Sequence, residues 1–152
     1  MSSDHSRSTS DSKRRGLIEE ELTGKIIGAF FEVYHALGFG LVEVLYSRAM
    51  DIALRRRGLY VDREFPIEVF FEEQQIGVQR LDFLVEQKVV VEIKARHKLV
   101  DADRRQLLSY VTVANLPVGL LLHFGPVPSF ERVVGGRRPN VRRSGPPSPS
   151  TP

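Results

Sequence analysis

Apolar residues recur at helical spacing in the first third of the chain. Between residues 17 and 37 the apolar positions fall at Leu22, Ile26, Phe30, Val33 and Leu37. This i, i+3, i+4 recurrence predicts an amphipathic helix over residues 17–37. After Gly38-Phe39-Gly40 we expect a second helix over residues 42–57. Its expected inner face holds Leu41, Leu45, Ala49, Ile52 and Ala53.

Short runs rich in β-branched and aromatic residues follow the second predicted helix. The expected strands, with a break at Pro66, span residues 59–65, 67–71, 76–85, 89–95, 118–124 and 130–134. Helical spacing returns over residues 101–115, ahead of the last two apolar groups. The order helix, helix, several strands, helix, strand favours an α/β or α+β domain, with a central mixed sheet flanked by helices.

Three charged residues interrupt two of the predicted strands. The polar loop Glu86-Gln87-Lys88 between them predicts a β-hairpin. Asp82 and Glu92 are equidistant from Gln87, so a symmetric loop of odd length places them directly opposite each other. Glu92 and Lys94 share a face because side chains alternate along a strand. Two carboxylates and one ammonium group are therefore expected to converge.

This cluster has two interpretations. Opposed carboxylates destabilise a sheet, and burying them is costly unless something compensates their charge. A hard divalent cation such as Mg²⁺, which binds carboxylate oxygens, would provide that compensation. The alternative is a structural salt bridge from Asp82 or Glu92 to Lys94 or Arg80.

Further candidates lie at helical spacing. Glu43 and Tyr46 are three residues apart and fall on one helix face, although an acid in the first turn also suits the helix dipole without any chemistry. Gln106 and Tyr110, four residues apart, share a face of the third helix, where they could equally be an ordinary exposed pair. His97, near the acidic centre, is either a phosphate contact or a solvated loop residue.

Composition changes the picture mainly at the two ends. Residues 1–15 are rich in Ser and charge, and residues 135–152 in Gly, Pro, Ser and Arg, so both are predicted to be disordered tails around one domain at 16–134. The ends contribute +2 and +4, so the formal charge of +3 leaves −3 for the domain. The basic tail would either attract phosphates without selectivity or be a solubilising or unselected extension without such a role.

Cysteine is absent and no long apolar run occurs. The chain therefore has neither a disulfide framework nor a zinc–thiolate site. It also shows no membrane span and no secretory signal peptide. We expect a cytoplasmic protein without a membrane partner.

Taken in order, five sequence features resemble the PD-(D/E)xK nuclease superfamily. They are Glu43, Asp82, Glu92-Ile93-Lys94, Gln106 and Tyr110. The Gln-x-x-x-Tyr step at residues 106–110 is similar to that of the RecB-like branch. Residues 40–46 resemble the signature of the GxxExxY family of small bacterial proteins, whose Leu-Leu-x-Phe-Gly end matches residues 121–125. The resemblance covers residues 20–134, with one departure: Leu81, and not proline, precedes Asp82.

The resemblance implies a restriction-endonuclease-like core and a metal-dependent nuclease. Asp82, Glu92 and the carbonyl group of Ile93 would bind Mg²⁺ or Mn²⁺, with Glu43 supporting them. Lys94 would orient the attacking water or stabilise charge on phosphorus. The residues expected to position substrate or support the site are Gln106, Tyr110, Tyr46, Arg96 and Lys98.

A nucleic acid would be the substrate, and we expect DNA rather than RNA. No feature reads base sequence, so specificity would require a protein partner, a homodimer or a structured substrate. A noncatalytic module that binds nucleic acid or protein on the same fold is the alternative. An intact Asp, Glu and Lys argues against that alternative, because a binder has no need of two carboxylates beside phosphate.

Overall fold

The computed structural model describes residues 5–135, and for residues 5–18 it describes the backbone alone. The elements are α1 (His5–Leu37), α2 (Glu43–Arg56), β1 (Val61–Phe71), β2 (Gln74–Val85), β3 (Val89–Lys94), α3 (Asp101–Val113), β4 (Val118–Phe124) and β5 (Pro128–Val134). Within this part of the chain, no helix is both long enough and apolar enough to cross a membrane.

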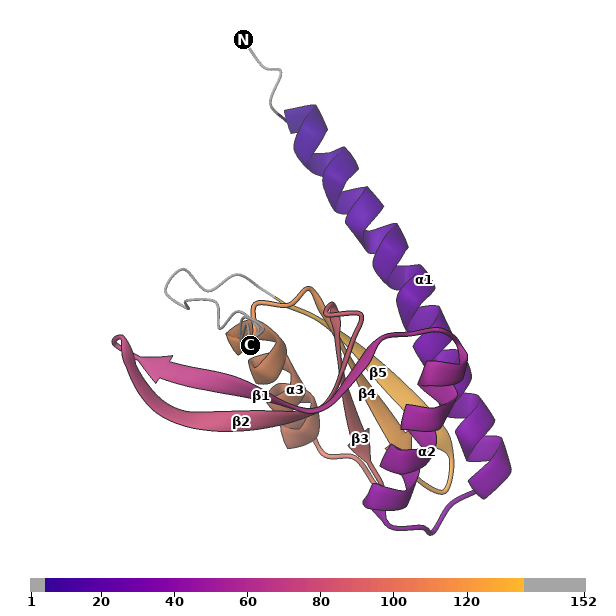
Figure 1. Ribbon diagram of the computed structural model, residues 1–152. Coiled ribbons are helices and arrows are strands. Elements are labelled where there is room, and N and C mark those ends of the chain that lie inside the picture. The colour runs from indigo at the N-terminus through magenta and orange to yellow at the C-terminus, as the bar shows by residue number, and fades with distance from the viewer. Residues whose placement is uncertain (1–4, 136–152) are drawn as a thin grey trace, which may run out of the picture.

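The five strands form one mixed sheet in the order β1-β2-β3-β4-β5 (Figure 1). β3 and β4 run parallel, and every other neighbouring pair is antiparallel. Parallel neighbours need a crossover connection, which α3 provides. The predicted central mixed sheet flanked by helices is therefore confirmed.

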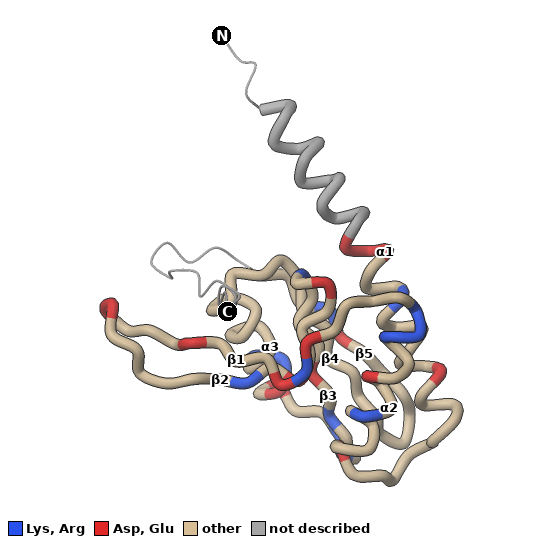
Figure 2. The backbone as a smooth tube through the Cα atoms, in the orientation of Figure 1, with Lys and Arg blue, Asp and Glu red and all other residues tan. Residues whose placement is uncertain are grey.

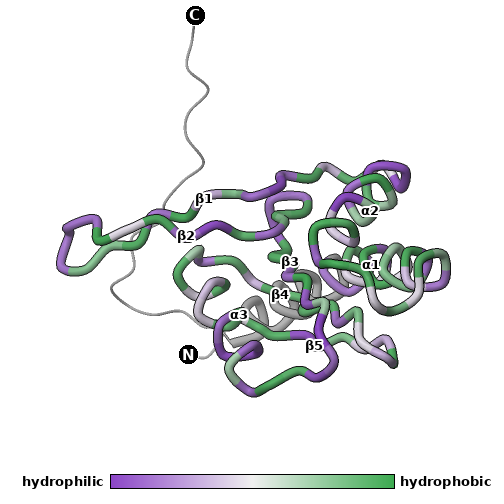
Figure 3. Tube along the Cα trace, turned by 90° about the horizontal axis from the view of Figure 1, so that it is seen from below, coloured by the Kyte–Doolittle hydropathy of each residue, from purple (hydrophilic) through white to green (hydrophobic). Residues whose placement is uncertain are grey.

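Helices cover the two faces of the sheet unequally. α1 and α2 pack on one face, where Phe124 of β4 meets Phe30 edge-on at 4.8 Å between ring centroids and stacks on Tyr46 at 4.2 Å. α3 packs on the other face through a smaller core that includes Leu107 and Val111. Figure 3 shows α1 and α2 lying together on one side, with α3 apart from them.

Near the midpoint of β1 and β2 the alternation of side chains is interrupted, so that residues two apart lie on opposite faces of the sheet. Arg63 and Phe83 face the α2 side, where the Arg63 guanidinium lies 5.8 Å from the Phe83 ring centroid. Two residues further along each strand, Phe65 and Leu81 pack in the α3 core instead. Residues two apart normally share a face, and the switch occurs at Glu64, whose φ is 51°. Beyond it, residues 65–81 form a projecting hairpin, here called the arm (Figure 1).

The first helix begins earlier than predicted. α1 starts at His5 and not at Leu17, so part of the stretch predicted to be disordered is helical. No glycine or proline interrupts residues 5–15, and the backbone can therefore continue the helix outward. Residues 1–4 and 136–152, the remainder of the predicted tails, lie outside the described residues. The assignment of 16–134 as the domain stays a prediction.

Two further expectations were wrong in detail. Pro66 does not divide β1, because β1 is the edge strand and tolerates a residue without an N–H group. The inner face of α2 is rotated from the predicted one: Leu45 and Ile52 are exposed. The buried residues of this helix are Tyr46, Met50, Ala53 and Leu54.

Candidate active site

β2 and β3 separate where the two carboxylates lie. Regular pairing runs from Val85 opposite Val89 to Phe83 opposite Val91. At the next pair of residues, Asp82 and Glu92, the hydrogen bonds between the two strands are made by side-chain carboxylates instead of backbone carbonyl groups. The Asp82 N–H donates to Glu92 Oε1 at 3.1 Å, and the Ile93 N–H donates to Asp82 Oδ2 at 2.8 Å. The two residues are therefore opposite each other, as the hairpin symmetry predicted.

The sheet interior makes ionisation of Glu92 unfavourable. Glu92 is 6% exposed, in a strand whose other members are mostly apolar. Burial raises its pKa, and the neighbouring Asp82 carboxylate raises it further, while Lys94 opposes the rise. One oxygen of each carboxylate accepts a hydrogen bond from a backbone N–H group, and the two side chains also lie close enough to hydrogen-bond to each other when one is protonated.

Glu43 reaches the same cluster from α2. It lies in the first turn of that helix, and its carboxylate accepts a hydrogen bond from the Ala95 N–H group just after β3. Partial desolvation raises the pKa of Glu43 and the Asp82 carboxylate adds to the rise, whereas Lys94 and Arg96 lower it. A third carboxylate thus interacts electrostatically with the strand pair.

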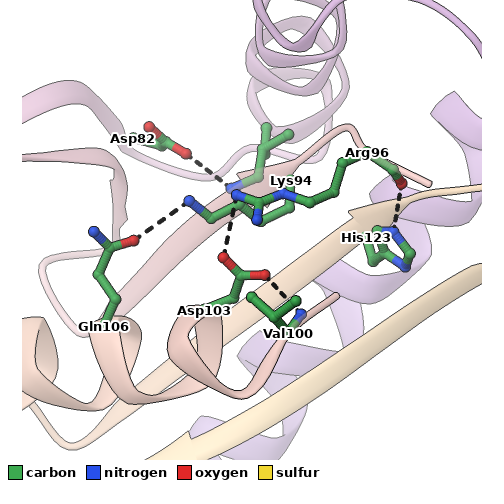
Figure 4. A network of polar contacts seen from close by, with 8 residues as sticks. Asp82, Lys94, Arg96, Val100, Asp103, Gln106 and His123 are labelled. Carbon is green, nitrogen blue, oxygen red and sulfur yellow. Dashed lines mark hydrogen bonds and ion pairs between the residues drawn. The ribbon is translucent and has the colours of Figure 1, made fainter. Parts of the chain in front are cut away.

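α3 supplies the polar groups on the other side. The Lys94 ammonium donates to Gln106 Oε1 at 3.3 Å (Figure 4). Tyr110, one turn further along α3, is half-buried, and its pKa is raised by burial and then by the Glu92 and Asp82 carboxylates. The structure therefore brings together six of the residues named from the sequence, namely Glu43, Asp82, Glu92, Lys94, Gln106 and Tyr110.

Arg96 is held by protein groups, although its side chain is 45% exposed. Its guanidinium pairs with the buried carboxylate of Asp103 at 3.1 Å, and its carbonyl group lies 2.7 Å from His123 Nε2 (Figure 4). Because a carbonyl group can only accept, Nε2 carries the imidazole proton. Arg96 therefore has a structural role, and its expected contact with substrate stays a prediction. Lys98 is exposed and has no ion-pair partner among the described residues.

Tyr46 also differs from its expected role. Its side chain is fully buried, and its hydroxyl group donates to the Gly38 carbonyl and accepts the Leu41 N–H at 3.2 Å. Gly40 within this loop has φ 115°, which favours glycine. Tyr46 therefore fixes the loop that leads into Glu43 and is not placed to touch a substrate.

Sequence reasoning missed two residues that position the site. Asp103 holds Arg96 and also accepts the Val100 N–H at 3.0 Å, and His123 holds the Arg96 carbonyl. A Cβ atom at Gly125 would collide with the His123 ring, so a residue without a side chain is required there. The available signal was a histidine inside an apolar strand, followed two residues later by glycine.

The carboxylate oxygens of the site suit a hard cation, although the described residues do not surround a metal position on all sides. In the part of the chain that the structure describes, no three His, Cys, Asp or Glu side chains form a compact metal-ligating group. Asp82 and Glu92 nevertheless face each other, with Lys94 opposing the rise in the pKa of Glu92, and their carboxylate oxygens are of the type that Mg²⁺ and Mn²⁺ prefer. A site with two carboxylates and several waters is typical of Mg²⁺.

Comparison with known proteins agrees with this geometry. The family model of the PD-(D/E)XK nuclease superfamily matches residues 20–133, which include α2, α3 and nearly all of the five-stranded sheet. No curated protein and no solved structure matches the chain. The matched range is three quarters of the sequence and contains every residue of the carboxylate cluster. The chain therefore belongs to the PD-(D/E)XK nuclease superfamily.

Proposed function

We propose that this protein is a metal-dependent nuclease that hydrolyses phosphodiester bonds of nucleic acid, with water as the nucleophile. The observation that carries the proposal is the Asp82–Glu92 pair, which replaces the backbone ladder at the point where β2 and β3 separate. Membership of a superfamily that is generally composed of nucleases supports the same activity. Residues 40–46 further support assignment to the GxxExxY family.

Asp82, Glu92 and the Ile93 carbonyl group would hold the cation, with Glu43 supporting them. Mg²⁺ or Mn²⁺ held there would supply Lewis acidity toward a phosphoryl oxygen and make water a better nucleophile near neutral pH. A cation would also relieve the repulsion between the two opposed carboxylates. The buried Glu92 would then ionise readily, because the positive charge that offsets its own would be present.

Lys94 would stabilise the negative charge that develops on the phosphoryl group. Its ammonium group already interacts with Glu43 and Glu92 and is directed by Gln106. A preorganised cation of this kind stabilises a transition state without reorganising during the reaction. Tyr110 lies close enough to both carboxylates for their charge to raise its pKa, and it would support them from α3.

Cleavage of a nucleic-acid panel tests the proposal directly. Purified protein with Mg²⁺ or Mn²⁺ is incubated with single-stranded, duplex and branched DNA and RNA, beside Asp82→Asn, Glu92→Gln and Lys94→Met. We expect each variant to lose at least about a hundredfold in rate, because each removes charge from the reacting centre. DNA is expected to be cut in preference to RNA.

Two exposed residues away from the cluster provide matched controls. Glu68→Gln on the arm and Lys88→Met in the β2–β3 loop remove the same charges and should leave cleavage unchanged. If wild-type protein is folded, binds Mg²⁺ and nucleic acid, and cuts nothing, the noncatalytic alternative replaces the proposal. Equal cleavage by Asp82→Asn and wild type would also contradict it.

A further inference from the structure

Two aromatic rings lie next to each other at the rim of the site. Phe39 belongs to the loop between α1 and α2, and His97 to the loop after β3; their ring centroids are 6.1 Å apart and their planes meet at 79°. Phe39 precedes Glu43 by four residues, and His97 follows Lys94 by three. Because Glu43 is hydrogen-bonded to Ala95, both loops adjoin the carboxylate cluster.

Buried polar anchors hold both rings in place. The Tyr46 hydroxyl group bonds to Gly38 and Leu41, on either side of Phe39. The His123 imidazole bonds to the carbonyl group of Arg96, the residue before His97. A binding surface that is fixed in advance loses little conformational freedom when a ligand arrives.

The Phe39 ring is nevertheless open to solvent. This residue is 47% exposed, although its loop is anchored on both sides. In an edge-to-face pair the ring faces are only partly covered, and an aromatic face that is not covered can stack on a nucleobase. Lys94 and Lys98 lie in the same region without ion-pair partners among the described residues, which suits a ligand that carries phosphates.

The surface beyond His97 has room for the nucleotides that would follow the stacked base in a nucleic-acid strand. An open hollow of about 440 Å³ lies there, lined by His97 and Lys98 on one side and by Val127 and Ser129 on the other. The lining also includes the Glu131 carboxylate, so a phosphate of a nucleotide would lie toward Lys98, and its flat base would lie against the apolar part of the lining.

The arm is unsuited to a duplex. Residues 61–85, which include the arm and the strand ends that carry it, hold six acidic side chains and two basic ones, Arg63 and Arg80, so their net charge is −4. Acidic residues mark the tip of the arm (Figure 2). A duplex carries one negative charge for about every 1.7 Å of its axis, so this hairpin would repel one lying along it. A duplex also keeps its bases stacked on each other and cannot offer a base face to Phe39.

We propose that the site acts on nucleic acid with unpaired nucleotides, one base of which stacks on Phe39 beside His97. This inference rests on the proposed nuclease function and specifies its substrate class. The protein would then select single strands, flaps or frayed ends, where bases are free to leave their own stack.

Binding without cleavage tests this inference. Fluorescence anisotropy in EDTA compares the binding of a labelled single-stranded oligonucleotide with that of a hairpin duplex whose stem contains the same sequence. In a separate measurement, 2-aminopurine in the single strand reports base stacking through the quenching of its fluorescence. We expect Phe39→Ala to weaken single-strand binding by roughly tenfold, the effect of losing one base–aromatic stack, and to abolish the quenching. Duplex binding should not change.

Matched variants distinguish aromatic stacking from a merely apolar contact. Phe71→Ala removes an exposed phenylalanine from the tip of the arm and should behave as wild type, as should Phe39→Trp, which keeps an aromatic face. If Phe39→Leu also binds single strands as wild type, the contact is merely apolar, as for a protein partner, and the inference is overturned. Equal losses for single strand and duplex would overturn it too.

The inference and the proposed function can fail separately. If Asp82→Asn loses cleavage while Phe39→Ala changes neither cleavage nor single-strand binding, the proposed nuclease function stands and the proposed stacking site is wrong. If the protein binds single strands selectively through Phe39 but cuts no substrate, the proposed stacking site stands and the proposed nuclease function is wrong.

Discussion

At the scale of single residues, Glu92 makes the stability of the metal-free protein depend on pH. Burial and the Asp82 carboxylate raise its pKa from the ordinary 4.5 to about 8. The folded state therefore holds a proton that the unfolded state releases, so this contribution is complete below pH 4.5 and is lost as pH rises through 8. We expect metal-free protein to lose on the order of a few kcal/mol of unfolding free energy between about pH 5 and pH 8.

Urea denaturation in EDTA at a series of pH values measures this loss. Glu92→Gln keeps an oxygen acceptor for the Asp82 N–H and cannot ionise, so its stability should vary much less over the same range. Glu68→Gln on the exposed arm is the control and should follow wild type. Added Mg²⁺ should restore stability at about pH 8, since a ligand of the folded state stabilises it. A flat wild-type profile in EDTA would contradict the prediction.

Tyr46 gives a second prediction at this scale. Tyr46→Phe keeps the buried ring and removes the hydroxyl group that ties the Gly38 carbonyl to the Leu41 N–H. We expect a loss of about 1–2 kcal/mol in unfolding free energy, because two backbone groups lose their partner. Tyr60→Phe, at a residue that is 55% exposed, should change stability little. Equal denaturation midpoints for the two variants would show that the hydroxyl group does not hold the loop.

At the scale of elements, the exchange of faces in β1 depends on Glu64. Its φ of 51° is unfavourable for a residue with a Cβ atom and worse for a β-branched one. We expect Glu64→Val to lower the unfolding free energy by at least about 1 kcal/mol, whereas Glu68→Val, in an ordinary strand position, should be neutral or slightly stabilising. Chemical denaturation of the two variants checks this, and equal stabilities would mean that Glu64 carries no strain.

The hairpin shows what strand patterns can and cannot predict. The opposition of Asp82 and Glu92 was predictable because it requires only the symmetry of a short loop. The exchange of faces was not, because strict alternation puts Leu81 and Phe83 on one side of the sheet. The actual arrangement depends on the backbone of Glu64 on the neighbouring strand and on the distant α3 core that receives Leu81.

At the scale of the whole molecule, the C-terminal sequence carries a charge of its own. Residues 136–152 contain four arginines and no acid. Deleting them should reduce the salt dependence of nonspecific single-strand binding by about three units of slope in log K against log salt, because each neutralised phosphate contributes about 0.7. Anisotropy titrations from about 50 to 300 mM salt check this. An unchanged slope would mean that these arginines do not contact phosphate.

The sequence predicted the residues of the carboxylate cluster, but it did not predict the residues that hold the surrounding loops in place. Glu43, Lys94, Gln106 and Tyr110 were found because each lies at strand or helix spacing within a recognisable order. Tyr46 was assigned to the substrate because it shares a helix face with Glu43, and Arg96 because it is a basic residue just after the Glu92 strand. Their partners, Asp103 and His123 for Arg96 and Gly38 for Tyr46, depend on how separate elements pack, which local spacing does not encode.

The turn at the tip of the arm offers a point of attachment for single-molecule work. Glu72 and Glu73 are exposed, and the residues around them belong to neither hydrophobic core. A cysteine placed at Glu72 would be the sole thiol of the chain, since the sequence has none. One maleimide dye or one surface tether would then couple at a known position, well separated from the carboxylates, and report the orientation of the protein on an immobilised strand.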